Sequence, residues 1–343
     1  MTLPSAPRRV LVIQLRRFGD VVLTTALFED LRRAFPSVPI DFLVGAAAAP
    51  MLEHHPLISE RIVYDQEHAL RMWREIRARH YDWIIDVQSS PRTAPLTLVS
   101  GAKKRVGWDV KGWGWVYTHR LPRGGRAHEY VVRQRQRLLE LLGVSVHRSR
   151  PRLYITGAER ELGELDLANA GVPRGSLRVG MLLSTAKSAN AWNVAGFADV
   201  AHALSAEGVT PVIFSTRGDA ALVLEMQRSA PRSVVMPEME IRRFLGALAG
   251  CHVFVSGDTG PAHMAAALDV PTVTIFGATS PVLWNAGLPT TVVVRDTNVP
   301  CLECQHDDCP IGHDCMHGVT AAAVLTRVRE LLGRPEVIQL SRR

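Results

Sequence analysis

Short apolar runs rich in β-branched residues alternate with longer amphipathic stretches along the chain, and this rhythm constrains the fold more than any other feature. Such alternation is typical of parallel sheets whose strands are joined by crossover helices. In the first half we expect strands at 9–15, 40–44, 61–63, 83–87 and 105–107, and helices at 21–34, 67–80 and 128–142. After a connector at 151–155 we expect strands at 178–183, 210–214, 234–236, 253–256 and 272–276, and helices at 196–206, 219–229, 241–249 and 261–268.

Two successive α/β stretches of similar size predict two Rossmann-like domains facing across a cleft, and 343 residues suffice for both. We expect an N-terminal domain at 1–155, which would bind an acceptor, and a C-terminal domain at 156–343, which would bind a donor. A closing helix is expected at 320–332, and packing back on the N-terminal domain is one arrangement open to it. Ligands of such sheets bind beyond the carboxyl ends of the strands, so loops that follow strands are the candidate sites.

Charge is distributed unevenly along the chain. Residues 1–150 hold 24 Lys and Arg against 14 Asp and Glu, whereas the remainder holds 16 against 19. This excess predicts either a solvated basic face or an anionic partner, such as a glycolipid or the inner membrane surface. No nucleic-acid motif accompanies it, so nucleic acid is not expected. Neither a secretory signal nor an apolar run of spanning length is evident, which predicts a cytoplasmic protein, peripheral to the membrane at most.

The loop after the first expected strand carries polar residues but lacks the Gly-x-Gly-x-x-Gly pattern of nicotinamide and flavin sites. It contains Arg16, Arg17, Gly19 and Asp20. Asp20 stands where a helix N-cap belongs, and capping is one interpretation. The other is catalytic: a carboxylate there could take a proton from an attacking hydroxyl while the two arginines hold an anionic acceptor.

The clearest motif is Gly-Asp-Thr-Gly-Pro-Ala-His at 257–263, between an expected strand and a helix of small residues. Pro261 suits the first helical position, where no N–H is required, and Gly260 lets a ligand approach the backbone. The free N–H groups and the helix dipole would favour a pyrophosphate. A neutral His263 directed at a ligand fits this position better than an imidazolium, which would oppose the dipole. A plain capped helix is the alternative.

A second loop of this kind follows the strand expected at 178–183. It supplies Ser184, Thr185 and Lys187. Small and hydroxyl residues with one lysine suit a diphosphate, although a single surface lysine is often merely solvated.

Four of the five cysteines lie within 15 residues, spaced C-x2-C-x4-C-x5-C. They are Cys301, Cys304, Cys309 and Cys315. In a cytoplasmic protein such a cluster favours a structural zinc or iron site over disulfides. Its spacing is tighter than that of ordinary zinc ribbons, so reduced thiols or adventitious disulfides remain open.

Together these motifs resemble those of the lipopolysaccharide heptosyltransferases, glycosyltransferase family 9, which have the GT-B fold. The resemblance rests on Phe-Gly-Asp-Val-Val at 18–22 and Ser-Gly-Asp-Thr-Gly-Pro-Ala-His at 256–263, and it covers about residues 8–335. Further similar segments lie at 86–92, 104–107, 128–130 and 276–279, and the cysteine run resembles the tail of the heptosyltransferase II branch.

The resemblance implies a role for each matching residue. Asp20 would be the general base on the acceptor hydroxyl, and Lys187 would neutralise the departing diphosphate. The donor site would comprise Ser184, Thr185, Asp258, Thr259, Gly260 and His263. The acceptor contacts would come from Arg16, Arg17, Gln88 and Arg92.

The implied reaction is inverting transfer of heptose from ADP-L-glycero-D-manno-heptose to the inner core of lipopolysaccharide. Its acceptor is a lipid A-core ending in Kdo or heptose, and it needs no cofactor. The chain departs from many relatives at 190–193, where Asn-Ala-Trp-Asn follows the lysine loop, so the exact donor contacts of 187–193 are not carried over. Alternatives are a protein acceptor, as in the autotransporter heptosyltransferases, a sugar-nucleotide epimerase, and a non-catalytic nucleotide-binding module.

Overall fold

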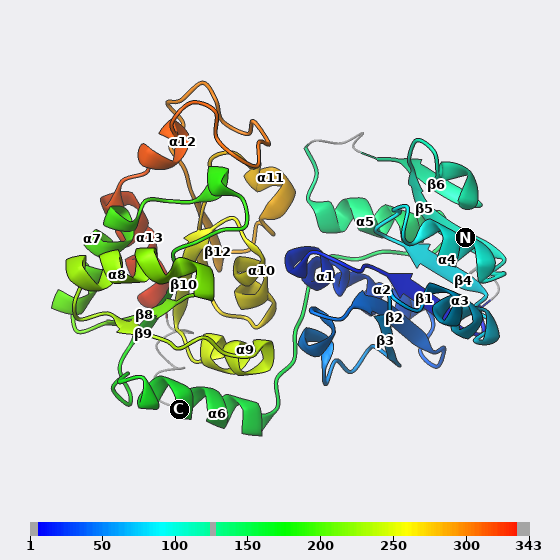
Figure 1. Cartoon of the computed structure of the whole chain (residues 1–343), viewed down its shortest axis with the longest axis horizontal. Helices are drawn as coiled ribbons and strands as arrows, with labels where there is room; N and C mark the ends of the chain where they lie inside the picture. Colours follow the sequence, from blue (N-terminus) through cyan, green and yellow to red (C-terminus); the bar gives the residue numbers. More distant parts are fainter. Residues whose placement is uncertain (1–5, 124–127, 335–343) are drawn as a thin grey trace. The chain divides into compact units, whose positions relative to one another are not determined.

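A computed structural model describes residues 6–123 and 128–334. The chain divides into two compact units, Met1–Tyr154 and Ile155–Arg343. Each is built around its own parallel sheet of six strands, and each is treated by itself below (Figure 1).

In the first unit the strands lie in the order β3-β2-β1-β4-β5-β6. They are β1 (Val10–Ile13), β2 (Ile40–Gly45), β3 (Arg61–Tyr64), β4 (Trp83–Asp86), β5 (Lys104–Asp109) and β6 (His119–Pro122). The helices are α1 (Phe18–Thr24), α2 (Ala26–Ala34), α3 (Ala69–Ala78), α4 (Ala94–Val99) and α5 (Val131–Glu140), with short 3-10 turns η1 (Ala49–Leu52) and η2 (Gly114–Val116). Leu11 and Ile13 of β1 share a buried cluster with Met72 and Ile76, so α3 covers one sheet face. Helices α1, α2 and α5 pack together as a second group.

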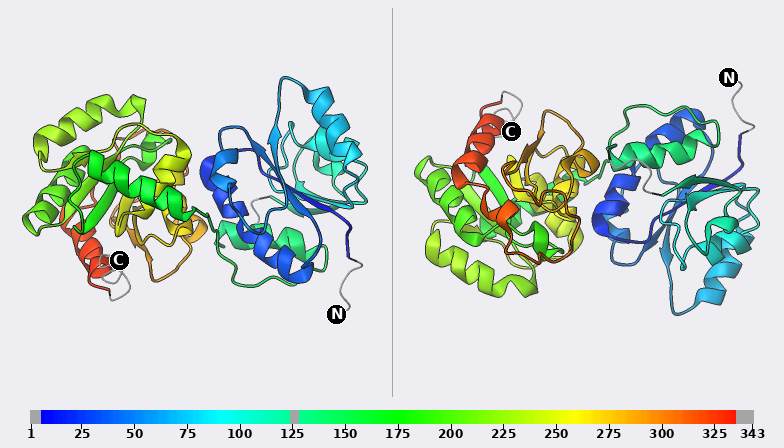
Figure 2. Two further views of the ribbon diagram at one scale, coloured as in Figure 1. Left: turned by 90° about the horizontal axis from the view of Figure 1, so that it is seen from below. Right: turned by 90° about the horizontal axis from the view of Figure 1, so that it is seen from above.

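The second unit repeats this topology, with the order β12-β11-β10-β7-β8-β9. Its strands are β7 (Arg178–Leu182), β8 (Thr210–Phe214), β9 (Val234–Val235), β10 (Val253–Gly257), β11 (Thr272–Ile275) and β12 (Thr291–Val294). Its helices are α6 (Gly157–Asn169), α7 (Val194–Ala206), α8 (Ala220–Ser229), α9 (Ile241–Ala249), α10 (Gly260–Ala267), α11 (Pro281–Trp284), α12 (Asp314–His317) and α13 (Ala321–Leu332), with η3 (Ser188–Asn190) and η4 (Arg217–Asp219). The same relative strand order in both units is that of the Rossmann fold. The predicted α/β class, with two Rossmann-like sheets, is confirmed (Figure 2).

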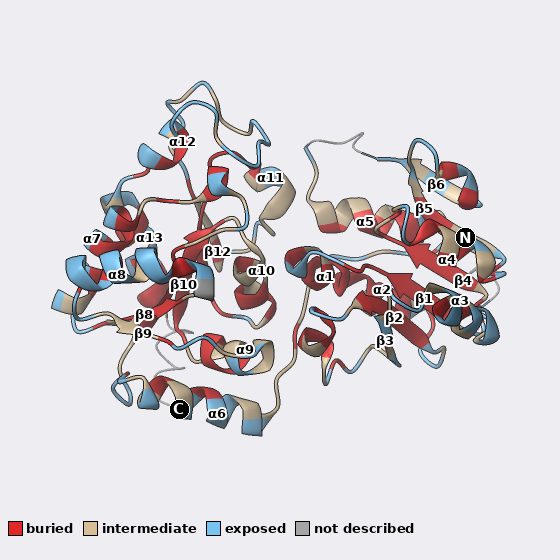
Figure 3. Ribbon diagram, in the orientation of Figure 1, coloured by how far each residue is buried: buried red, intermediate tan, exposed pale blue. Residues whose placement is uncertain are grey.

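The core of each unit lies on its sheet, where the strands are mostly buried and the outer helix faces are exposed (Figure 3). Helix α13 packs against α7, β10, β11 and β12, and its Val324, Val328 and Leu331 join the buried cluster of the second unit. That unit therefore accounts for the apolar face of the closing helix. Within the described residues, none of the helices combines the length and the apolar character that a membrane span requires.

The first helix of the chain differs from expectation in a way that bears on Asp20. The helix expected at 21–34 is two helices, and the first begins at Phe18, with Arg17 at the N-cap. Asp20 is therefore the third residue of α1, and the N-cap interpretation is wrong. In the first turn its negative charge still complements the helix dipole.

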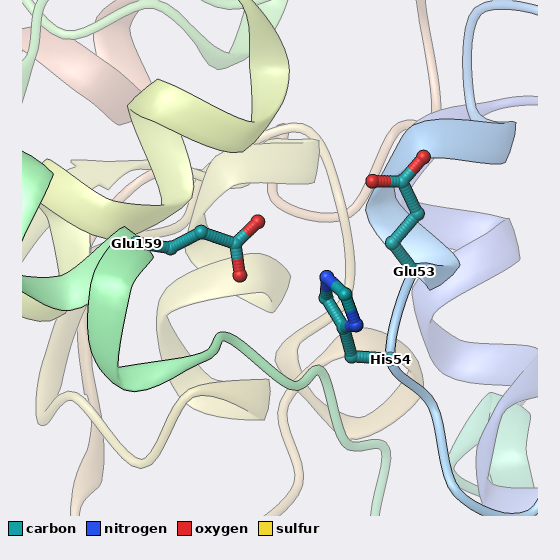
Figure 4. Close-up of side chains that lie close together, drawn as sticks. All are labelled: Glu53, His54 and Glu159. Atoms are coloured by element: carbon teal, nitrogen blue, oxygen red, sulfur yellow. The ribbon is translucent and has the colours of Figure 1, made fainter.

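Helix α6 was not expected, although its start carries a readable signal. Thr156 and Glu159 form a capping box, the pattern in which each side chain accepts from the other's backbone N–H. Glu159 also pairs with Arg242 of α9 at 2.6 Å, and Figure 4 shows its side chain leaving the first turn of α6. Only Gly163 and Leu167 of this helix are buried. Its apolar periodicity is therefore too weak to predict a helix from the sequence.

Candidate functional site

In the first unit the loops after β1 and β4 lie side by side because the two strands are parallel neighbours, with Ile13 paired to Asp86. The side-chain oxygen of Gln88 accepts from the backbone N–H of Leu15 at 2.8 Å and from that of Arg16 at 3.2 Å. The structure thus joins Gln88 to Arg16, two residues that the sequence offered as separate acceptor contacts.

A cavity of about 460 Å³ opens at these loops. Among the described residues, its charged lining consists of the carboxylate of Asp20 and four arginines, at positions 16, 17, 123 and 135. A cavity with this balance attracts a ligand that carries several negative charges.

Asp20 is held by a residue that the motif does not contain. Arg135 of α5 forms an ion pair with the Asp20 carboxylate and donates to its backbone carbonyl at 2.7 Å and to Thr24 Oγ1 at 3.0 Å. The Arg135 side chain is almost fully buried, whereas that of Asp20 keeps 27% of its surface exposed. Arg135 therefore fixes the carboxylate while part of it stays open to the cavity.

Sequence reasoning missed both Arg123 and Arg135. Arg123 follows β6 and donates to the backbone carbonyl of Gln88, and burial lowers the pKa of its guanidinium. Arg135 could have been found, because it shares the buried face of α5 with Val132, Leu138 and Leu139. An arginine on a buried helix face needs a partner.

Arg92 does not line this cavity. It borders a second one of about 410 Å³, which shares Arg16 and Arg17 with the first but has mainly apolar walls. Of the four acceptor residues named from the sequence, Arg16, Arg17 and Gln88 thus surround the carboxylate and Arg92 lies apart.

In the second unit three neighbouring strands, β7, β10 and β11, bring their carboxyl-end loops together. Gly257 ends β10, and a Cβ there would lie 2.3 Å from the carbonyl oxygen of Asn190. Only glycine at this position permits so close an approach of the loop that carries Lys187. The Asn190 amide donates to the backbone carbonyl of Asp258 at 3.4 Å, which ties the same two loops together.

The turn between β10 and α10 places a carboxyl and an imidazole side by side. Thr259 is the N-cap, and Gly260 begins α10. His263 Nε2 lies 3.8 Å from Asp258 Oδ1, and both side chains are largely buried. Burial raises the pKa of Asp258, whereas the nearby charges of His263 and Lys187 act to lower it. The helix N-terminus, Lys187 and His263 together form an environment suited to an anion.

Trp284 of α11 lies near this turn, and Ser280 is the N-cap of the same short helix. The rings of Trp284 and His263 are 6.2 Å apart. The indole N–H of Trp284 and the hydroxyl of Ser280 are buried and have no hydrogen-bond partner among the described residues. Buried donors without partners are uncommon in native proteins and are consistent with a ligand that would bind them.

Lys187 lies in the loop after β7, together with Ser184 and Thr185. The Thr185 hydroxyl donates to the carbonyl of Lys187 at 2.5 Å, and the Lys187 ammonium pairs with Asp307 at 2.6 Å. All the donor residues named from the sequence therefore lie in the second unit, at the carboxyl ends of β7 and β10. Asp20 belongs to the first unit.

The four clustered cysteines are close enough to influence one another. Burial, together with the proximity of Cys301, Cys304 and Cys309, raises the pKa of Cys315 to about 11. Cys309 shows the opposite trend, because backbone N–H groups of residues 311–313 hydrogen-bond to its sulfur and lower its pKa. The N–H of His313 lies 3.1 Å from that sulfur. Within the described residues, no three of the cysteine sulfur atoms lie within 4.8 Å of one another, so the thiols do not form a closed metal site here.

Comparison with known proteins identifies relatives of this chain. Residues 69–314 match the model of glycosyltransferase family 9 (heptosyltransferase). The chain is 27% identical over 298 residues to lipopolysaccharide heptosyltransferase 3 of Escherichia coli, covering 79% of this chain and 84% of that protein.

Solved structures agree. The structure of E. coli ADP-heptose lps heptosyltransferase II matches with a TM-score of 0.80 at 20% identity, over 94% of this chain and 98% of that one. An E. coli heptosyltransferase solved with ADP-2-deoxy-2-fluoro heptose matches with a TM-score of 0.69 at 21% identity, over 94% and 99%. At these identities the likeness establishes a shared fold, GT-B.

Proposed function

The chain belongs to glycosyltransferase family 9, and from that membership we propose that it transfers heptose from ADP-L-glycero-D-manno-heptose to the inner core of lipopolysaccharide. The observation that carries the proposal is the anion environment of the second unit. There the loop that carries Lys187 packs against Gly257, and Lys187 and His263 lie near the N-terminus of α10 beside the Asp258 carboxyl. An ADP-sugar presents its diphosphate to such an environment.

We assign donor binding to the second unit and acceptor binding to the first. Asp20 takes the proton from the acceptor hydroxyl, and the oxygen attacks the anomeric carbon as the bond to the diphosphate breaks, with inversion. Lys187 and the α10 N-terminus stabilise the charge that develops on the departing ADP. No step of this displacement needs a metal or a cofactor.

The arginine-lined cavity supports an anionic acceptor. Kdo carries a carboxylate, and phosphates decorate lipid A-core, so the four arginines around Asp20 match a Kdo- or heptose-terminated acceptor.

The excess of basic residues in 1–150 would also draw the protein to the anionic inner face of the membrane without a spanning helix. Sedimentation with anionic vesicles that weakens at high salt would support this contact, and equal binding to neutral vesicles would contradict it.

Turnover tests the proposal directly. The protein is incubated with ADP-L-glycero-D-manno-heptose and a Kdo- or heptose-terminated acceptor, and ADP release is measured. We expect Asp20→Asn to lower kcat by about 10²–10⁴-fold with ADP binding unchanged. Asp65→Asn, at a half-exposed position outside the lining of this cavity, is the matched control. Full activity in Asp20→Asn, or no ADP release with any such acceptor, would contradict the proposal.

The same assay separates the alternatives. Consumption of donor without any acceptor would indicate a sugar-nucleotide epimerase. Transfer to an autotransporter protein but not to lipid A-core would indicate a protein heptosyltransferase. ADP binding without either reaction would leave a nucleotide-binding module.

We further propose that Cys301, Cys304, Cys309 and Cys315 hold one structural metal ion, zinc or iron. The C-x2-C-x4-C-x5-C spacing and the N–H bonds to Cys309 support this assignment. The purified protein should contain about one equivalent of metal, and Cys309→Ser should lose it. The distant Cys251→Ser serves as the control. A metal-free protein with four alkylatable cysteines in this cluster would contradict the assignment.

A further inference from the structure

The loop that carries the clustered cysteines, residues 301–315, is joined to the donor-lysine loop, residues 184–190. The backbone N–H of Ala189 donates to the carbonyl of Asp307 at 3.1 Å. The Ser188 hydroxyl donates to the Asp308 carboxylate at 2.6 Å. One contact is therefore made by the backbone and the other by a side chain.

The cysteine loop is also attached to the loop after β11. The N–H groups of Glu303 and Gln305 donate to the carbonyls of Gly277 and Ala278, at 2.9 and 2.8 Å. A Cβ on Gly277 would lie within 3 Å of the Cys315 and Met316 sulfur atoms, so the two segments are in close contact. These contacts fix the position from which Asp307 reaches the lysine.

The third contact between the cysteine loop and the lysine loop is an ion pair, and it involves Lys187, a residue of the proposed reaction. The Lys187 ammonium lies 2.6 Å from Asp307 Oδ1, and the Asp307 side chain is 65% exposed. Lys187 also lies close enough to Asp258 to stabilise its carboxylate. Asp307 thus occupies one side of the cation that would receive the donor diphosphate.

We propose that Asp307 is a stand-in for the donor diphosphate and Asp308 a positioning residue for the lysine loop. Asp307 holds the Lys187 ammonium in the absence of donor and competes with the incoming diphosphate for it. Asp308 keeps residues 184–190 in place in both states. This inference rests on the proposed function, because it assumes that an ADP-sugar is the ligand.

The geometry decides which role each carboxylate plays. The Lys187–Asp307 pair is open to solvent on its Asp307 side and contributes little to the order of the loop, since ion pairs that water can screen are weak. The backbone bond from Ala189 persists whatever side chain stands at 307. Removing the Asp307 charge therefore frees the ammonium without freeing the loop, whereas removing the Asp308 charge weakens an anchor.

Two isosteric substitutions should have opposite effects on ADP binding. We expect Asp307→Asn to bind ADP about two- to fivefold more tightly, the range that loss of one exposed ion pair allows. Asp308→Asn should bind ADP more weakly by a similar factor. Asp314→Asn removes an exposed charge from the same loop and should leave the dissociation constant unchanged. Calorimetric titration of the full chain with ADP measures all three.

A double-mutant cycle tests whether the effect passes through the lysine. In a Lys187→Gln background, Asp307→Asn should no longer change the dissociation constant for ADP. An unchanged or weaker affinity in Asp307→Asn alone, or a gain that persists without Lys187, would overturn the role given to Asp307.

Hydrogen exchange tests the anchor without any ligand. The amides of 184–190 should exchange faster in Asp308→Asn than in the wild type or in Asp314→Asn, and equal exchange would overturn the anchoring role. If the wild-type protein binds no ADP, the proposed function fails. Asp307 then loses its role as a stand-in for diphosphate, whereas the anchor is still judged by exchange.

Discussion

Asp20 and Lys187 share a feature that no local motif could reveal. Each ionised group is held by an opposite charge from a distant part of its own unit. Asp20 pairs with Arg135, 115 residues away, and Lys187 pairs with Asp307 in the cysteine loop. The Asp20 carboxylate loses side-chain freedom in this way, which favours a reactive geometry, whereas the role proposed for Asp307 is to compete for Lys187. The partners are therefore as informative as the residues that the motifs contain.

Cys309 should be more reactive than Cys315 and Cys251. Backbone N–H groups lower its pKa, whereas burial raises that of Cys315 to about 11 and that of Cys251 to about 12. At neutral pH the thiolate fraction therefore falls from Cys309 to Cys251. After treatment with a chelator, iodoacetamide labelling followed by peptide mass spectrometry should modify Cys309 first and Cys251 last of these three. Faster labelling of Cys315 than of Cys309 would contradict this order.

His55 should make the first unit sensitive to mild acid. Its ring is buried against Phe28 and Tyr154, and burial lowers its pKa to about 4. Between about pH 6.5 and 4 the His55 ring therefore binds a proton in the unfolded chain but not in the folded protein. The stability that rests on the neutral ring is complete above pH 6.5 and is lost as the pH falls toward 4.

Urea unfolding measures this effect. Between about pH 7.5 and 5 the wild-type protein should lose about 2 kcal/mol more of its unfolding free energy than His55→Leu, which lacks the titrating group. Equal losses in the two proteins would show that the buried imidazole is not the cause.

At the scale of secondary structure, the positions of the strand ends account for both candidate sites. Expected strands were found wherever an apolar run was long and buried, as at β1, β7 and β10. Two of the four edge strands, β3 and β9, were expected, whereas β6 and β12 were missed: β6 is half-exposed and ends in Pro122, and the middle of β12 is only partly buried. Edge strands are paired on one side only, so their sequences carry a weaker apolar signal.

The contact between α6 and α9 offers an element-scale test. A Cβ on Gly163 of α6 would lie 2.2 Å from the backbone carbon of Gly246, so the two helices meet at glycines. Gly163→Ala should therefore destabilise the second unit by about 1–3 kcal/mol. Gly157→Ala, in the first turn of the same helix, meets nothing within 4 Å and should cost little. Urea midpoints of the two variants compare them, and equal midpoints would contradict the tight contact.

At the scale of the whole molecule, two units with the same strand order carry different chemistry. The first has a cavity with four arginines around one carboxylate, and the second has an anion environment at a helix N-terminus. The fold is common to both, so the difference lies in the loops at the carboxyl ends of the strands.

ADP should therefore protect only one of the two units from hydrogen exchange. With saturating ADP, we expect slower exchange in 184–190, 258–263 and 276–280 of the second unit and no change in 14–20 and 87–90 of the first. Binding to the native state alone also stabilises it, by about 2.7 kcal/mol at a hundredfold excess over the dissociation constant. Protection confined to the first unit would contradict the assignment of the donor to the second.

The sequence by itself determined the α/β class, the Rossmann-like sheets, the family and the turn at 257–263. These depend on local patterns: apolar periodicity, glycine and proline at turns, and the residues that open a helix. Only the tertiary structure decided that Arg135 reaches Asp20, that Asn190 packs behind Gly257 and that Asp307 holds Lys187. Such contacts join residues from loops far apart in the chain. Which loops meet depends on the order of the strands in the sheet, and no local sequence pattern records that order.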